Sequence, residues 1–145
     1  MPQHKDYMRR ALALGAAQSG HTAENPAVGC VLVKDGKIIG EGATQDGGRP
    51  HAETVARQVA DRQARRATAY VTLEPCSHYG QTAPCANALI EAGIARCFIA
   101  VVDPDPRVHW RGAALLQEAG IDVWVGLCED EAAQAHETFF ARVRA

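Results

Sequence analysis

The spacing of apolar positions along the chain predicts a regular alternation of helices and strands. Residues 6–18 carry tyrosine, leucine and alanine side chains at helical spacing and are soon followed by a glycine, which predicts a helix. Residues 28–33 and 38–42 are strand-like, and the Asp-Gly pair between them is a strong signal for a β-hairpin. The sheet is therefore expected to begin with an antiparallel pair.

The alternation continues through the rest of the chain. It predicts helices over residues 51–64, 85–93, 112–119 and 129–143, and strands over residues 69–73, 97–102 and 122–125. The order α-β-β-α-β-α-β-α-β-α is typical of an α/β fold in three αβα layers, with a mixed five-stranded sheet between helices on both faces. At 145 residues, the chain is expected to form one domain, residues 1–145.

The most informative residues form a discontinuous pattern around one histidine and two cysteines. His51 is followed two residues later by Glu53, and Cys76 and Cys85 each follow a proline. One imidazole and two thiolates can bind a tetrahedral Zn²⁺ and leave its fourth position free for water, as in catalytic zinc sites. A carboxylate beside that water can take its proton and pass it to a ring nitrogen and to a departing amine. The pattern therefore predicts hydrolytic deamination, with Glu53 as the catalytic residue.

The predicted elements bring these residues to one end of the sheet. His51 is expected in the first turn of a helix, where it and Glu53 can both point toward the pocket. Cys76 is expected just after a strand end, where open α/β sheets bind their ligands. Cys85 is expected to begin a helix, whose dipole favours the thiolate. One structural alternative stays open for Glu53, that of a carboxylate which orients a metal ligand.

Charge and composition restrict the partners of the chain. The 15 basic and 17 acidic residues include no basic block, which argues against nucleic-acid binding and favours a small substrate. The arginine cluster at residues 62–66 is expected to be a solvated helix end. No apolar run approaches the roughly 20 residues of a membrane span, and the polar first residues lack the apolar region of a signal peptide, so we expect a cytoplasmic protein.

The cysteine count supports the same compartment. Five cysteines, two of them assigned to metal, suit a reducing environment better than a disulfide framework. The other three lie in or next to apolar runs and are expected to be small core residues: Cys30, Cys97 and Cys128.

Four segments of the chain occur together in the order of a known enzyme family. They are Asn25-Pro26-Ala27-Val28-Gly29, Gly48-Arg49-Pro50-His51-Ala52-Glu53, the run from Pro75 to Cys85, and Asp103-Pro104-Asp105-Pro106. Zinc deaminases generally carry H-x-E followed by P-C-x-x-C, whereas here eight residues separate the two cysteines. With this spacing, the chain closely resembles the deaminase domain of the bacterial bifunctional riboflavin-biosynthesis deaminase-reductase. The resemblance implies the cytidine-deaminase-like fold, a Zn²⁺ cofactor, and a pyrimidine nucleotide substrate, 2,5-diamino-6-ribosylamino-4(3H)-pyrimidinone 5′-phosphate.

The resemblance also implies which residues contact the substrate: Asn25, Thr44, His78, Gln81, Asp103, Asp105 and Arg111. Simpler roles stay open for two of them, an Asx turn for Asn25, which precedes a proline, and an exposed loop position for His78. Glu74 lies beside a metal ligand but before a proline at a strand end, and we expect it to make a structural hydrogen bond with nearby backbone.

Four positions depart from the family pattern. Gln81 stands where Lys or Arg is usual, and a glutamine cannot neutralise a substrate phosphate. Thr44 stands where many relatives have histidine, and His109-Trp110 replaces a common Ala-Gly pair. Three arginines are candidate replacement ligands for a phosphate: Arg49, Arg107 and Arg111.

The family resemblance and the last helix suggest possible partners. The family enzyme carries a reductase domain after the deaminase, so the chain is expected to be a stand-alone deaminase or a fragment, with a reductase domain or subunit as a partner. Phe139 and Phe140 point about 100° apart on a helix, so one can enter the core while the other covers a neighbour, and we expect a homodimer. Phe98 and Trp124 also fit core or subunit packing. Three histidines are expected in terminal or surface-like segments without a chemical role: His4, His21 and His136.

Two alternative functions stay open. The altered loop could admit a different aminated pyrimidine or purine, including an unphosphorylated one. The other alternative, from a different class, is an inactive zinc scaffold that binds a separate reductase. The intact Glu53 argues against it, because a structural zinc does not require that carboxylate.

Overall fold

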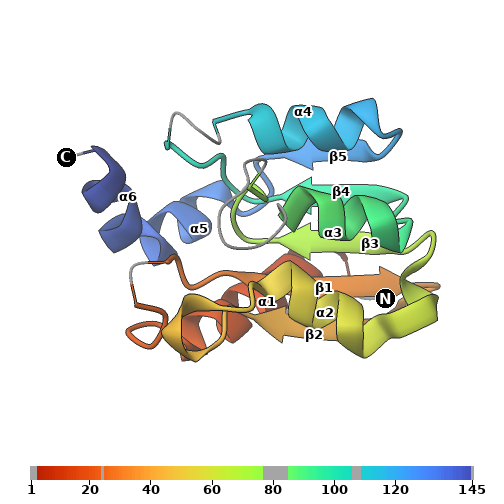
Figure 1. Cartoon of the computed structure of the whole chain (residues 1–145), viewed down its shortest axis with the longest axis horizontal. Coiled ribbons are helices and arrows are strands. Elements are labelled where there is room, and N and C mark those ends of the chain that lie inside the picture. Colours follow the sequence, from red (N-terminus) through yellow and green to blue (C-terminus); the bar gives the residue numbers. More distant parts are fainter. Residues whose placement is uncertain (1–2, 24, 77–84, 106–108, 145) are drawn as a thin grey trace.

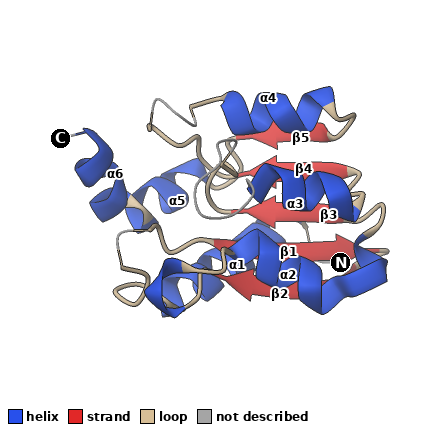
Figure 2. Cartoon of the chain, in the orientation of Figure 1, coloured by secondary structure: helices blue, strands red, loops and turns tan. Residues whose placement is uncertain are grey.

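A mixed five-stranded sheet forms the centre of the protein, with helices on both faces (Figures 1 and 2). The computed structural model describes residues 3–23, 25–76, 85–105 and 109–144. The helices are α1 (His4–Ala17), α2 (Ala52–Ala60), α3 (Cys85–Ala92), α4 (Arg111–Glu118), α5 (Glu129–Ala135) and α6 (Glu137–Arg144). The strands are β1 (Gly29–Lys34), β2 (Lys37–Ala43), β3 (Thr68–Val71), β4 (Arg96–Ile99) and β5 (Asp122–Val125).

The sheet combines antiparallel and parallel pairing. The strand order is β2-β1-β3-β4-β5, in which β1 is antiparallel to both of its neighbours, whereas β3, β4 and β5 are parallel. The turn between β1 and β2 has positive φ angles at Asp35 (52°) and Gly36 (75°), as tight hairpin turns of this kind require. The predicted fold class and the initial antiparallel hairpin are therefore confirmed.

The two faces of the sheet carry separate apolar clusters. Cys30 and Leu32 of β1 lie in the cluster beneath α2, α3 and α4, whereas Val31 and Val33 lie in the cluster beneath α1 and α5. Because both faces of β1 are covered, its sequence is a continuous apolar run rather than an alternating one.

Helix α2 packs unusually close to β2. A Cβ atom at Gly42 would overlap with the carbonyl oxygen of Ala52 and lie 2.6 Å from the backbone nitrogen of Ala56. Gly40 makes a similarly close approach to Ala56 and Ala60 one turn further along the helix. Small residues on both elements thus fix the distance of α2 from the sheet. They thereby also fix the position of the residues at the start of the helix.

The end of the chain differs from the prediction. The single helix expected over residues 129–143 is wrong, because α5 ends at Ala135 and α6 begins at Glu137. The surface-like position expected for His136 is also wrong, since this residue is only 2% exposed and its Nε2 atom lies 3.2 Å from the Thr72 hydroxyl. Ala132, His136 and Phe140 recur every four residues and are all buried. An alanine and a histidine carry too weak an apolar signal to reveal that inner face.

Other packing predictions have mixed outcomes. His4 and His21 are exposed, as expected. Cys30 and Cys97 are fully buried, as expected, whereas Cys128 is only half-buried, with a left-handed backbone before α5. Phe140 is buried and Phe139 half-buried. Tyr70, Phe98 and Trp124 stack side by side across β3, β4 and β5. Within the described ranges, we find no helix with the length and apolar character of a membrane span.

Candidate active site

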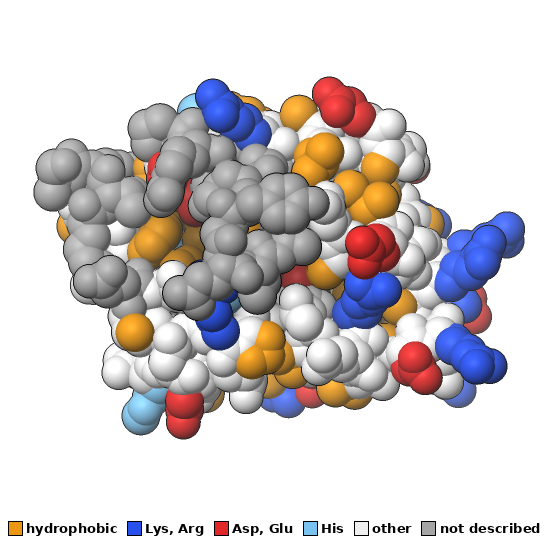
Figure 3. Space-filling view, viewed as in Figure 1, with side chains coloured by type: hydrophobic (Ala, Val, Ile, Leu, Met, Phe, Trp, Pro, Cys, Tyr) orange, Lys and Arg blue, Asp and Glu red, His pale blue; other side chains and the backbone are white. Residues whose placement is uncertain are grey.

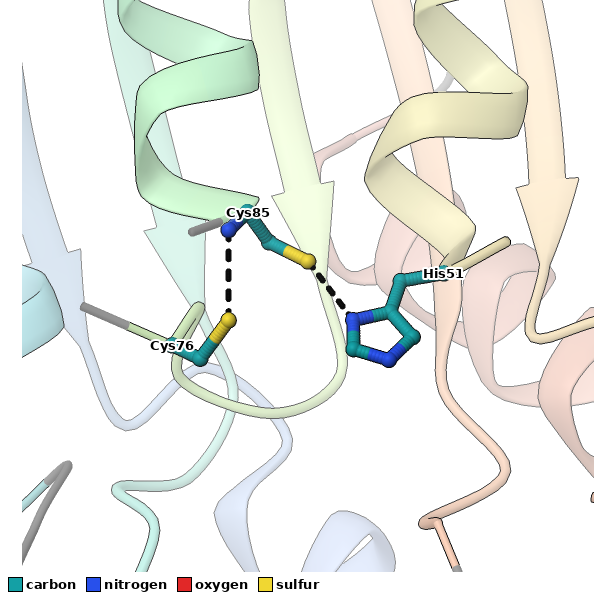
Figure 4. Close-up of side chains that lie close together, drawn as sticks. All are labelled: His51, Cys76 and Cys85. Carbon is teal, nitrogen blue, oxygen red and sulfur yellow. Dashed lines mark hydrogen bonds between the residues drawn. The ribbon is translucent and has the colours of Figure 1, made fainter. Parts of the chain in front are cut away.

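Three side chains from separate segments meet at one end of the sheet (Figure 4). His51 immediately precedes α2, Cys76 lies in the segment after β3, and Cys85 is the first residue of α3. Their ligand atoms all lie within 4.8 Å of one another. His51 was expected in the first turn of the helix but occupies the N-cap position, with an extended backbone (φ −75°, ψ 162°). The backbone before the helix therefore aims the imidazole, while Glu53 lies in the first turn.

Direct polar contacts connect the three residues. The Nδ1 atom of His51 lies 2.8 Å from the Sγ atom of Cys85. The backbone N–H of Cys85 donates to the Sγ atom of Cys76 across 3.2 Å. The first N–H groups of a helix have no partner within the helix, so the start of α3 supplies a donor that stabilises a thiolate at Cys76.

The two cysteines cannot both be ionised at low cost without a cation. A hydrogen bond with Cys85, supported by His51, lowers the pKa of the Cys76 thiol to about 4. The same hydrogen bond, together with burial, raises the pKa of Cys85. Two adjacent thiolates repel each other, and a positive ion between them removes that repulsion. The electrostatics of the cluster therefore favour metal binding.

The donor set fits Zn²⁺. One imidazole nitrogen and two thiolates are ligands that zinc prefers, at bond lengths of about 2.0–2.3 Å. The three ligand atoms, which lie within 4.8 Å of one another, are close enough to bind one ion. Among the residues that the structure describes, no fourth acidic, histidine or cysteine side chain joins this group.

Glu53 lies beside the cluster and is 3% exposed. Burial raises the pKa of its carboxyl group to about 7, and the negative charge of Cys76 acts in the same direction. A carboxyl group in such surroundings can both accept and donate a proton near neutral pH.

The loop that leads to His51 is fixed by two other predicted site residues. The side-chain amide of Asn25 donates to the carbonyl oxygen of Gly48 at 2.9 Å. Thr44 is 1% exposed; its hydroxyl donates to the Pro26 carbonyl at 3.0 Å and accepts from the Val28 N–H at 3.0 Å. Both contacts of the Thr44 hydroxyl are to backbone, which gives it a structural role in this loop, and its predicted contact with substrate stays a prediction. The contact of Asn25 with substrate stays a prediction.

A second loop is fixed by Glu74, which is 3% exposed. Its Oε1 atom accepts hydrogen bonds from the N–H groups of Asp103 (3.3 Å) and Trp110 (3.1 Å). Its Oε2 atom accepts from the N–H of Ala113 at 3.0 Å. Burial raises the pKa of Glu74, and these three donors partly offset the effect. The predicted backbone hydrogen bond of Glu74 is therefore confirmed, and it extends to three donors.

The structure describes some of the remaining predicted site residues, and others lie outside the described ranges. Asp103 and Asp105 are buried, and the Asp105 N–H donates to the Asp103 carboxylate at 2.9 Å. Arg111 is exposed at the start of α4, and Arg49 is half-buried just before His51. Three predicted residues lie outside the described residues: His78, Gln81 and Arg107.

Sequence reasoning missed two features of the site. It did not predict that Glu74 joins three donors that are 29 to 39 residues away in the chain, because no local pattern encodes such contacts. It also did not predict the left-handed backbone of Trp110 (φ 64°). The glycine that the family resemblance leads one to expect at this position was a usable signal, because glycine favours that conformation.

Comparisons with known proteins agree with this geometry. The family described as the cytidine and deoxycytidylate deaminase zinc-binding region matches residues 1–101. The chain is 53% identical over 142 residues to the riboflavin biosynthesis protein RibD of Escherichia coli (strain K12), a match that covers 98% of this chain and 39% of that protein. It is 46% identical over 138 residues to the diaminohydroxyphosphoribosylamino-pyrimidine deaminase of Buchnera aphidicola subsp. Acyrthosiphon pisum, covering 95% of this chain and 94% of that protein.

Solved structures give the same result. The RibD of Acinetobacter baumannii superposes with a TM-score of 0.91 at 45% identity, over 96% of this chain and 39% of that chain. The chain thus spans about two fifths of the length of the RibD proteins that it matches. The predicted three-layer architecture is confirmed by this superposition.

Proposed function

This chain belongs to the cytidine and deoxycytidylate deaminase family of zinc-binding proteins, and from that membership we propose that it deaminates 2,5-diamino-6-ribosylamino-4(3H)-pyrimidinone 5′-phosphate. The observation that carries the proposal is the cluster of His51, Cys76 and Cys85 next to a buried Glu53. A closed structural zinc site would need a fourth protein ligand, and it would not require a neighbouring carboxylate.

Each residue of the cluster has a defined task in this reaction. His51, Cys76 and Cys85 would hold the zinc ion, which when bound makes water nucleophilic at neutral pH. Glu53 would accept a proton from the water that attacks the amine-bearing carbon. It would return that proton to the adjacent ring nitrogen and assist proton transfer to the departing amine, so that water is consumed and ammonia is released. The low exposure of Glu53 keeps bulk water from competing for the proton.

The surface supports a small substrate rather than a nucleic acid. Lys and Arg side chains are interspersed with Asp and Glu on the face shown in Figure 3, and the formal net charge of the chain is −2. A nucleic-acid deaminase would instead be expected to present a basic stripe. A cytoplasmic location and a homodimer also belong to this proposal, as does a reductase, on the same or a separate chain, that acts on the product.

The experiment is a comparison of substrates with purified, zinc-loaded protein. We expect ammonia release from the diaminopyrimidine nucleotide and little or none from cytidine, cytosine or guanine. Turnover of only the latter three would replace the proposed substrate with another aminated base. One zinc per chain without turnover of any substrate at any pH would instead favour the inactive scaffold.

A further inference from the structure

The start of α4 contains a residue that neither backbone preference nor burial explains. Trp110 adopts a left-handed backbone (φ 64°, ψ −8°) at the N-cap of α4 and makes no side-chain capping bond. This conformation favours glycine, and a bulky residue in it is strained. Trp110 is also 52% exposed, and its ring meets the His109 ring edge-on, with centroids 6.2 Å apart. Backbone strain that is retained at a largely exposed aromatic residue is a frequent property of functional sites.

Glu74 fixes this residue relative to the metal ligands. The carboxylate lies two residues before Cys76 and accepts the N–H of Trp110 at 3.1 Å and that of Ala113, in the first turn of α4, at 3.0 Å. Helix α4 also approaches the same segment directly, because a Cβ atom at Gly112 would overlap with the carbonyl oxygen of Pro75. The position of Trp110 is therefore tied to the segment that carries Cys76, through contacts with the two residues before it.

We propose that Glu74 is a positioning residue that holds Trp110 at the rim of the substrate pocket, where the exposed indole stacks on the pyrimidine ring of the substrate. The inference rests on the proposed function, because it assumes an aromatic substrate at the metal cluster. It makes Trp110 a specificity-determining residue, which favours planar, aromatic bases over other amines. Stacking on an aromatic side chain needs no particular hydrogen-bond pattern and tolerates different bases.

The contact between Trp110 and substrate can be measured by fluorescence. The chain has two tryptophans, so a Trp124→Phe variant reports Trp110 alone, and Glu53→Gln in the same chain prevents turnover. Titration with the diaminopyrimidine nucleotide should quench the emission in a saturable way. The matched control carries Trp110→Phe in place of Trp124→Phe and should show no quenching. Calorimetry should detect binding in both proteins; binding without quenching of Trp110 would overturn the stacking contact.

The role of Glu74 can be measured by comparing single substitutions at Glu74 and Trp110 with the double variant. In Glu74→Gln the amide nitrogen cannot accept a hydrogen bond, so at least one backbone donor loses its partner. We expect KM to rise about tenfold, which corresponds to the loss of one base-stacking contact. The values of kcat and zinc content should stay nearly unchanged. Trp110→Gly should raise KM by a similar factor and raise Tm by roughly 2–4 °C, because glycine relieves the strain. The double variant should be no worse in KM than Trp110→Gly alone.

Controls separate positioning from general damage. Glu118→Gln changes an exposed carboxylate at the other end of α4 and should leave KM and Tm unchanged. Additive effects of Glu74→Gln and Trp110→Gly, or a fall in kcat with zinc loss in Glu74→Gln, would overturn the positioning role.

Failure of the proposed function gives a different result. If the wild-type protein neither binds nor turns over the nucleotide, the function fails and the stacking contact fails with it. The hold of Glu74 on Trp110 is still decided without ligand: in the Trp124→Phe background, Glu74→Gln should lower the fluorescence anisotropy of Trp110. Unchanged anisotropy would contradict that hold.

Discussion

The metal cluster joins two sides of the molecule that are built by different means. His51 is placed by α2, which rests on β2 through close contacts between glycines and alanines such as Gly42 and Ala52. Cys76 follows a segment held by polar groups, with Glu74 bonded to three backbone donors and Thr72 bonded to the buried His136. Close packing of small residues is insensitive to pH, whereas a buried polar contact with a titratable partner is not. The two sides should therefore respond differently to the same perturbations.

Metal removal should have the largest effect, because one ion would bind ligands from both sides. Binding of a ligand at a thousand-fold excess over Kd stabilises the folded state by about 4 kcal/mol. Stripping zinc with a chelator should lower the free energy of unfolding by about this amount, and readdition of zinc should restore it. Chemical denaturation with and without chelator measures the difference. In a Cys76→Ser/Cys85→Ser variant, the chelator should have no effect.

Lower pH should have the second-largest effect, because it destabilises the side of the cluster that is held by polar groups. Burial lowers the pKa of His136 from 6.5 to about 4, so between these values the unfolded chain binds a proton that the folded chain does not. Stability should therefore be intact above pH 6.5 and fall as the pH drops toward 4, by up to about 3 kcal/mol. A neutral His136→Gln variant should lack this component. Urea denaturation at several pH values measures it, and parallel pH profiles for the two proteins would contradict the account.

The packed side should be weakened by added volume rather than by pH. Gly42→Ala places a Cβ atom against Ala52 and Ala56, and overpacking of this kind costs about 1–3 kcal/mol. The loss should be the same at pH 5 and pH 8, and zinc affinity should fall because α2 carries His51. Lys37→Ala, at an exposed position of the same strand, should leave both unchanged. A Gly42→Ala protein with full stability would show that the close approach is not required.

The same contrast explains what the sequence could reveal. His51, Glu53, Cys76 and Cys85 were predictable because their residue types and spacing reflect metal chemistry, and because each lies where a predicted helix or strand begins or ends. The contacts of Glu74 and His136 were not predictable, since they join residues far apart in the chain and leave no periodic pattern. Thr44 shows both kinds of information at one position. Its family position predicts a substrate contact, whereas the bonds of its hydroxyl to the backbone of Pro26 and Val28 could not be predicted from the local sequence.

The central claim is that Glu53 moves protons at a zinc site formed by His51, Cys76 and Cys85. Glu53→Gln retains the shape of the side chain but removes its ability to accept a proton. The decisive measurement is ammonia release from the diaminopyrimidine nucleotide by zinc-loaded wild-type and Glu53→Gln proteins, with zinc content determined on the same samples. We expect one zinc per chain in both and a loss of kcat of about 10²- to 10⁴-fold in the variant. Wild-type turnover by a zinc-loaded Glu53→Gln protein would contradict the claim.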